Sequence, residues 1–175
     1  NMVLRRLARI ELESDPAWRK ELGHFIVIGG GFSGVEVAGE LVDCLHSIRR
    51  YYPKVQADEL QVTVLHGADR LLPELSPRLG AAALASLRQR GVSVHLDARA
   101  ASISASGVQL ADGPFMRGQT VISTIGTVAN PLAAKLGLPM RHGRIVVEAD
   151  MSVEGHQGVW ALGDCACVPN AFDGK

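Results

Sequence analysis

Apolar residues recur at helical spacing in three parts of the chain: residues 2–22, 35–50 and 77–90. In the first part, Asp15 and Pro16 can either break the helix or start a second one, with Asp15 as the N-cap. In the third part, one face of the predicted helix is shared by Leu79, Ala83, Leu84 and Leu87. Each segment therefore predicts a helix with one side packed against other parts of the molecule.

Short apolar runs bounded by turn residues alternate with these helices and predict buried strands at residues 24–28, 60–65, 92–96 and 120–125. Residues 100–104 and 107–110 alternate well enough for a hairpin that turns at Ser106 and Gly107. This order of elements predicts an α/β fold. We expect a Rossmann-like parallel sheet with helices, in which an antiparallel β-meander supplies one crossover.

The pattern changes near residue 130, and a change of domain is plausible between residues 127 and 140. One or two helical turns are expected at residues 131–136, followed by short strands at 144–147 and 159–162.

Composition and charge exclude several classes of protein. The 18 basic and 18 acidic side chains give no net charge, so no basic excess is present for binding nucleic acid. No apolar run approaches the roughly 18 residues of a transmembrane helix. The 3 cysteines cannot form a disulfide framework and favour a reducing, cytoplasmic location. Neither the cysteines nor the histidines have the spacing of metal ligands, so no metal site is predicted.

The strongest chemical signal is the hexapeptide GGGFSG, which fits G-x-G-x-x-G between a strand and a helix. Gly29 would permit the tight turn, Gly31 would let a pyrophosphate approach the backbone, and Gly34 would let the helix pack close to the strand. The phosphates would then lie at the helix N-terminus, beside Phe32 and Ser33. A turn that binds nothing is the alternative, and a P-loop is excluded because no Gly-Lys-Ser/Thr follows.

The second half of a dinucleotide fingerprint is an acid at the end of the second strand, where it holds the adenosine ribose. Here that strand ends at His66, and Asp69 lies three residues further along. His66 and Arg70 could accept a 2′-phosphate, as in NADPH. Alternatively, His66 donates a hydrogen bond to a ribose oxygen or faces solvent. The cofactor is thus expected to be NAD(H) or NADP(H), with NAD(H) placed first.

Four stretches in one order carry a family resemblance: IVIGGGFSGVEVAGEL, VTVLHGADRLLPEL, VISTIGTVANPL and GVWALGDCACVP. They resemble the flavoprotein reductases of the pyridine nucleotide-disulfide oxidoreductase superfamily, and among them the type II NADH dehydrogenases. The resemblance implies an FAD-binding domain that is split in sequence, with an NAD(P)H-binding domain inserted in it. It divides this chain into a linker helix (1–22), an NAD(P)H-binding Rossmann-like domain (23–128) and a truncated, returning segment of the FAD-binding domain (129–175).

We expect this chain to be a fragment of a longer protein. Asn1 precedes Met2, and the sequence stops in loop-like residues. The alternative is a natural small protein with a ragged N-terminus. The resemblance implies that a fragment of this extent is catalytically silent and does not retain FAD.

The resemblance also implies roles for single residues. Glu36 would lie near the nicotinamide amide; alternatively, it is an acid in the first helical turn, stabilised by the helix dipole. Gly126 would line the nucleotide cleft. Asp164 would contact the FAD ribityl chain, and Gly163 would allow its close approach. Relatives that use NADH usually have Glu at the position of His66, so the ribose contact here departs from the family pattern.

The implied reaction passes hydride from NAD(P)H to the flavin and electrons onward to an acceptor, a quinone in the first reading. No side chain of this chain is then needed as a general acid or base, because the cofactors carry the redox chemistry. A disulfide, sulfide or ferredoxin acceptor is the alternative, as is a dinucleotide-binding module without turnover. The full-length protein could be a homodimer and lie peripherally on the inner face of a membrane.

Overall fold

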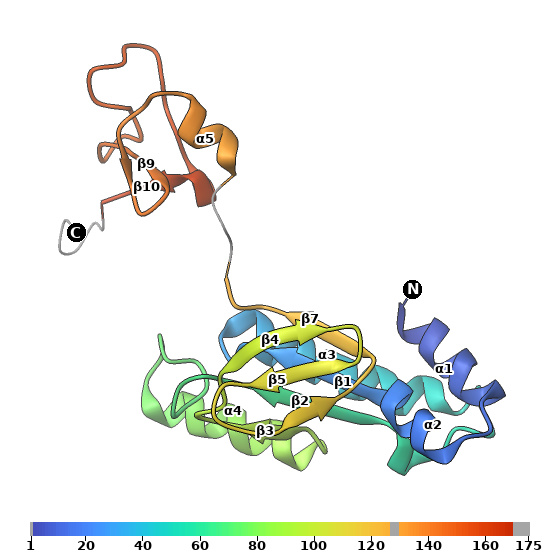
Figure 1. Cartoon of the computed structure of the whole chain (residues 1–175). Coiled ribbons are helices and arrows are strands. Elements are labelled where there is room, and N and C mark those ends of the chain that lie inside the picture. The colour runs from blue at the N-terminus through green and yellow to red at the C-terminus, as the bar shows by residue number, and fades with distance from the viewer. Residues whose placement is uncertain (1, 127–129, 170–175) are drawn as a thin grey trace. The chain divides into compact units, whose positions relative to one another are not determined.

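The computed structural model describes residues 2–126 and 130–169, which belong to two compact units, the first ending at Ile125 and the second beginning at Gly126. In chain order, the first unit contains α1 (Met2–Leu12), α2 (Pro16–Gly23), β1 (His24–Ile28), α3 (Phe32–Arg49), η1 (Ala57–Glu59), β2 (Gln61–Leu65), α4 (Pro77–Gln89), β3 (Ser93–His95), β4 (Ala100–Ser104), β5 (Gly107–Leu110), β6 (Phe115–Arg117) and β7 (Thr120–Ser123). The second contains α5 (Pro131–Lys135), β8 (Met140–Arg141), β9 (Arg144–Val146), η2 (Gly163–Cys165) and β10 (Ala166–Cys167) (Figure 1). Asn1, the predicted boundary at 128/129 and residues 170–175 lie outside the described residues.

A parallel sheet with the strand order β3-β2-β1-β7 forms the centre of the first unit. Val27 of β1 is aligned with Val64 of β2 on one side and with Ile122 of β7 on the other. Parallel neighbours require a crossover between successive strands, and the helices α3 and α4 supply two of them. The predicted α/β fold with a parallel sheet is confirmed.

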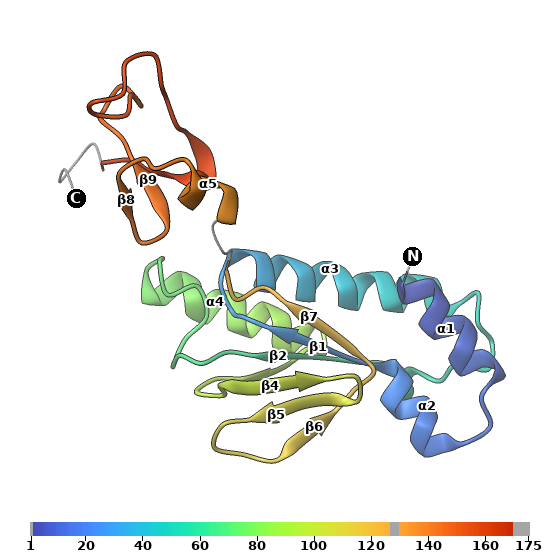
Figure 2. The ribbon, with the colours of Figure 1, turned by 45° about the horizontal axis from the view of Figure 1, so that its top comes forward.

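Both faces of this sheet are covered, which explains why β1 is apolar at almost every position. Phe25 and Val27 point into a core shared with the helices, whereas Ile26 and Ile28 point into a second core shared with Val108 of β5. Figure 2 shows the two layers, with α3 and α4 on one side of the sheet and β4, β5 and β6 on the other. The strands β4–β6 form the predicted antiparallel meander, which connects β3 to β7.

The N-terminal residues form two helices, and Leu7 and Ile10 of α1 are fully buried in the core of the first unit. Asp15 caps α2, accepting a hydrogen bond from the Ala17 amide at 2.9 Å, and Pro16 follows at the first helical position. The second of the two predicted arrangements of residues 2–22 is therefore correct.

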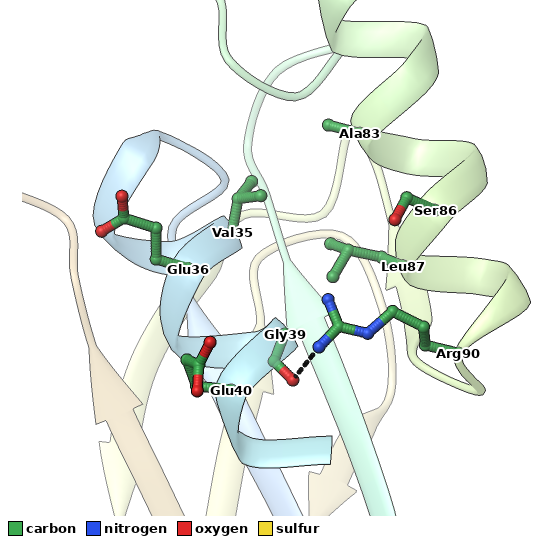
Figure 3. A pocket seen from close by; sticks show the side chains of 8 residues that line it. All are labelled: Val35, Glu36, Gly39, Glu40, Ala83, Ser86, Leu87 and Arg90. Carbon is green, nitrogen blue, oxygen red and sulfur yellow. Dashed lines mark hydrogen bonds between the residues drawn. The ribbon is translucent and has the colours of Figure 1, made fainter. Parts of the chain in front are cut away.

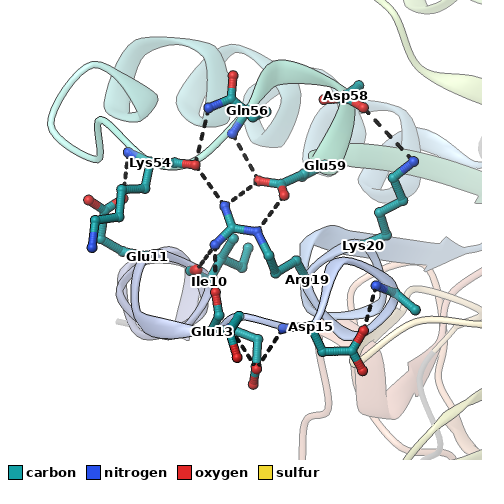
Figure 4. A network of polar contacts seen from close by, with 12 residues as sticks. Ile10, Glu11, Glu13, Asp15, Arg19, Lys20, Lys54, Gln56, Asp58 and Glu59 are labelled. Atoms are coloured by element: carbon teal, nitrogen blue, oxygen red, sulfur yellow. Dashed lines mark hydrogen bonds and ion pairs between the residues drawn. The ribbon is translucent and has the colours of Figure 1, made fainter.

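Arg19 on α2 ties these helices to the loop before β2 (Figure 4). Its guanidinium donates to the Glu13 carbonyl at 2.9 Å, the Lys54 carbonyl at 2.7 Å and Glu59 Oε2 at 2.7 Å. The side chains of Arg19 and Glu59 are only 12% and 9% exposed. The hydrogen bond from Arg19 lowers the pKa of the Glu59 carboxyl. The pair thus fixes the N-terminal helices to the sheet domain.

His24, the first residue of β1, is buried at the opposite end of the sheet from the glycine turn. Its Nδ1 lies 2.6 Å from the Arg117 carbonyl oxygen, which can only accept, so Nδ1 carries a proton. In the neutral ring Nε2 then accepts from the Thr63 hydroxyl at 2.7 Å. Burial lowers the pKa of His24, and the nearby His95 lowers it further.

The second unit has a small sheet with the order β10-β9-β8. Its core consists of Ala133, Ile145, Val147, Val153, Ala161 and Ala166. The strand predicted at 159–162 is wrong, because only Trp160 is bridged, to Ser152, and the side chain of Leu162 is 70% exposed. An apolar run in a short, loop-rich segment did not correspond to a buried strand here.

Candidate dinucleotide-binding site

The GGGFSG turn lies at the carboxyl end of β1, between that strand and α3. In open parallel sheets, ligands bind at this edge. Gly31 is the N-cap of α3, and no side chain caps the helix there. The first-turn amides of α3, beginning with Phe32 and Ser33, therefore lie at a helix N-terminus that favours anions. Phe32 is 51% exposed, and Ser33 is also exposed.

Gly29 and Gly34 are required by the backbone of the turn. Gly29 has φ +114°, and a Cβ there would lie 2.5 Å from Thr124 Oγ1. A Cβ on Gly34 would lie 1.9 Å from the Gly29 carbonyl oxygen, which means that α3 sits directly on the turn. The Thr124 hydroxyl donates to the Ile28 carbonyl at 2.9 Å and so braces the same turn from β7's end. The sequence did not single out Thr124.

Gly30, the variable position of the motif, is also constrained in this chain. Its amide donates to His66 Nδ1 at 3.0 Å, and its carbonyl accepts from the Leu72 amide at 2.8 Å. A Cβ on Gly30 would come within 2.6 Å of the His66 ring and of Leu71. The loop after β2 therefore packs against the glycine turn and fixes its path.

Gly31 differs from the other glycines of the turn. Its φ is −77°, which any residue adopts, and a Cβ there would meet no protein atom within 4 Å. Neither backbone strain nor packing explains a glycine at this position. The open space in front of it lies at the uncapped N-terminus of α3, so the position can admit a ligand close to the backbone.

His66 contacts the glycine turn and does not simply face solvent. Because Nδ1 accepts from Gly30, the proton of the neutral ring is on Nε2. Nε2 is buried and has no hydrogen-bond partner among the described residues. In this conformation, His66 supports the turn, and a direct contact of Nε2 with a ribose would require the ring to move.

A pocket of about 170 Å³ lies at the carboxyl ends of β1 and β2. Its walls come from these strand ends, the turn after β2, the loop before β4 and the end of the β7 segment: Ile28, Gly29, Leu65, His66, Gly67, Ala98, Arg99, Ala100 and Ile125. It is continuous in sequence and space with the glycine turn through Gly29. This is the edge at which the adenosine half of a dinucleotide would lie.

A larger pocket of about 440 Å³ lies between α3 and α4 and is lined in part by Glu36, Glu40 and Arg90 (Figure 3). Arg90 is held by Asp43 and the Gly39 carbonyl. This pocket lies between helices, so its size alone does not make it the nucleotide site. The prediction that Glu36 lies in the first helical turn is wrong. The helix α3 begins at Phe32, so that turn contains no acid and Glu36 follows it.

The residues predicted at the FAD lie in the second unit. Gly163 has φ +74° and begins η2, and no atom lies within 4 Å of where its Cβ would be. Asp164 is exposed, and its carboxylate has no hydrogen bond or ion pair with any described residue. Gly126, at the junction of the units, has φ +104°.

Two further findings concern the parts of the chain that the structure describes. No group of His, Cys, Asp or Glu side chains is placed to hold a metal ion. No helix there is both long enough and apolar enough to cross a membrane.

The parallel sheet and the glycine turn together place the chain in the Rossmann-like class of α/β proteins. The chain belongs to the pyridine nucleotide-disulphide oxidoreductase family, whose profile matches residues 4–173. It is 30% identical to the type II NADH:quinone oxidoreductase NdhA of Mycobacterium tuberculosis, over 95% of this chain and 38% of that protein. It is 31% identical to an external alternative NAD(P)H-ubiquinone oxidoreductase B4 of Arabidopsis thaliana, over 86% of this chain and 27% of that protein.

Solved structures show the same fold. NDH2 from Plasmodium falciparum in complex with NADH matches with a TM-score of 0.86 at 18% identity, over 96% of this chain and 37% of that one. A ferredoxin reductase from Rhodopseudomonas palustris matches with a TM-score of 0.69 at 28% identity, over 87% of this chain and 36% of that one. The chain thus spans well under half the length of these relatives.

Proposed function

We propose that this chain binds NAD(P)H through the GGGFSG turn and forms the nucleotide-binding part of an FAD-dependent oxidoreductase. The observation that carries the proposal is Gly31, the glycine of the turn that neither φ nor packing requires. A ligand pyrophosphate could approach the backbone at Gly31 because this residue has no Cβ to block it. The uncapped N-terminus of α3 supplies amides for the phosphate oxygens.

The second unit would supply part of the FAD site, with Asp164 toward a ligand hydroxyl and Gly163 allowing close approach. When bound, FAD accepts hydride from the nicotinamide. The role of this chain is to bind and orient the dinucleotide. Quinone is the proposed acceptor, because relatives that match 95% of this chain are named NADH:quinone oxidoreductases. The match to a ferredoxin reductase keeps a ferredoxin as the second candidate.

Titration of the chain with NADH, followed by nucleotide fluorescence, tests the nucleotide-binding step. We expect saturable binding in the wild type and at least tenfold weaker binding in Gly31→Ala, with an unchanged fold by circular dichroism. Gly91→Ala is a poor control because Gly91 has φ +91°. Ala81→Gly, at an exposed position of α4, is the better one. A folded wild type that binds no dinucleotide would refute the proposal.

A further inference from the structure

The pocket beside the glycine turn is lined by basic side chains and by no carboxylate, which is unusual for a site expected to hold the adenosine ribose. Of its lining residues, only His66 and Arg99 have ionisable side chains. A carboxylate at this edge would accept hydrogen bonds from the ribose hydroxyls and repel a 2′-phosphate. No carboxylate lines the pocket. The group that the fold places at the end of β2 is instead an imidazole that already bonds to Gly30.

Arg99 supplies a cation that nothing in the described part of the chain neutralises. Its side chain is exposed and has no hydrogen bond or ion pair with a described residue. Its Nε lies 3.9 Å from where a Cβ on Gly67 would be, so the side chain lies along the turn that follows β2. The acids of the two adjoining loops, Asp69 after β2 and Asp97 before β4, neither line the pocket nor pair with Arg99.

The backbone holds Arg99 at this place. The Ala98 amide donates to the His66 carbonyl at 2.8 Å, and the Asp97 amide donates to the Ala68 carbonyl at 3.0 Å. These bonds join the loop before β4 to the loop after β2. Arg70, the other basic residue that the sequence suggested, is instead turned toward its own loop, where it donates to the Pro73 carbonyl at 2.8 Å.

We propose that Arg99 recognises a phosphate monoester on the adenosine ribose, so that this chain binds NADPH at least as tightly as NADH. The inference rests on the proposed dinucleotide site and adds its specificity. A planar guanidinium matches phosphate oxygens in a bidentate way, and the absence of a lining carboxylate removes the repulsion that excludes NADPH elsewhere. Arg99 is thus the specificity residue of the pocket.

Calorimetric titration of the 175-residue chain with NADPH and, separately, with NADH tests this specificity. We expect the Kd for NADPH to be equal to or below that for NADH. Arg99→Gln should weaken NADPH about tenfold and change NADH less than twofold. The matched control is Arg88→Gln, which removes the same charge from an exposed position of α4 outside the pocket and should change neither Kd. Raising the salt concentration should weaken NADPH more than NADH.

The outcomes separate this inference from the proposed function. NADH binding with an NADPH Kd more than tenfold higher would overturn the specificity and leave the dinucleotide site intact. Equal weakening of both nucleotides by Arg99→Gln would also overturn it, because Arg99 would then contact a part that both share. Competition of NADPH by inorganic phosphate alone, without displacement by NADH, would place the phosphate outside the dinucleotide site and overturn it as well. If the folded wild type binds neither nucleotide, the proposed function itself is refuted.

Discussion

Replacing Gly34 by alanine should destabilise the first unit strongly, because α3 rests on the backbone of the turn. The added Cβ would lie 1.9 Å from the Gly29 carbonyl oxygen and 2.9 Å from Thr124 Oγ1, where real Cβ contacts essentially never come closer than 3.0 Å. The helix would have to move by about 1 Å relative to β1, yet its buried residues Val42 and Leu45 pack into the main core. Overpacking against a rigid backbone costs about 3 kcal/mol.

Urea denaturation followed by circular dichroism measures this loss as a lower midpoint at an unchanged slope. The matched variant is Gly31→Ala in the same turn, where a Cβ meets nothing within 4 Å. It should cost less than about 1 kcal/mol, which reflects the weaker N-cap preference of alanine relative to glycine. If the two variants lose the same free energy of unfolding, the close contact between α3 and the turn does not determine stability, and the reasoning fails.

Three further changes have outcomes that the structure fixes in direction. Arg19→Met should cost about 3 kcal/mol by leaving the Glu59 carboxylate buried without its partner, whereas Lys20→Met, whose ion pair is exposed, should cost less than about 0.5 kcal/mol by urea titration. Because the pKa of His24 is lowered in the folded state, the unfolded state takes up this proton at a higher pH. The free energy of unfolding should therefore fall as the pH drops below about 6.5, and His24→Gln should reduce this dependence on pH. Thr124→Val should cost about 1 kcal/mol and Thr124→Ser much less, since only serine retains the hydrogen bond to Ile28; equal losses would exclude a role for that bond.

The glycine motif and the positions of the strands along the chain could be predicted from the sequence because each depends on local rules. An apolar run between glycines predicts a buried parallel strand, and β1 spans the predicted residues 24–28. Gly29 and Gly34 were predicted from the needs of the backbone. The structure agrees, because Gly29 has a positive φ and Gly34 brings α3 into close contact with the turn. Asp15 and Pro16 likewise predict the start of α2, because the Asp15 side chain caps the helix and the fixed φ of Pro16 suits its first position.

The features that could not be predicted from the sequence depend on contacts between distant segments. Leu79 was expected on the buried face of α4 but is 51% exposed, because the helix approaches the core through Gly80, whose missing Cβ leaves room for the Leu71 carbonyl. Arg99 lies 33 positions after His66, and only the hydrogen bonds between their loops bring the two to one pocket. The position of Glu36 depended on where α3 begins, which the N-cap at Gly31 determines.

The different constraints on the glycines of the turn decide how its binding role can be tested. Any side chain at residues 29, 30 or 34 meets backbone, the His66 ring or Leu71, so a loss of binding in those variants would not be separable from a loss of structure. At Gly31, neither the backbone conformation nor the packing of the protein requires a glycine. A variant there changes only the space that a ligand would use, and Arg99→Gln changes only a side chain without a partner in the described residues. These two positions can therefore report on the ligand independently of the fold, one through the pyrophosphate that both nucleotides share and the other through the ribose phosphate that distinguishes them.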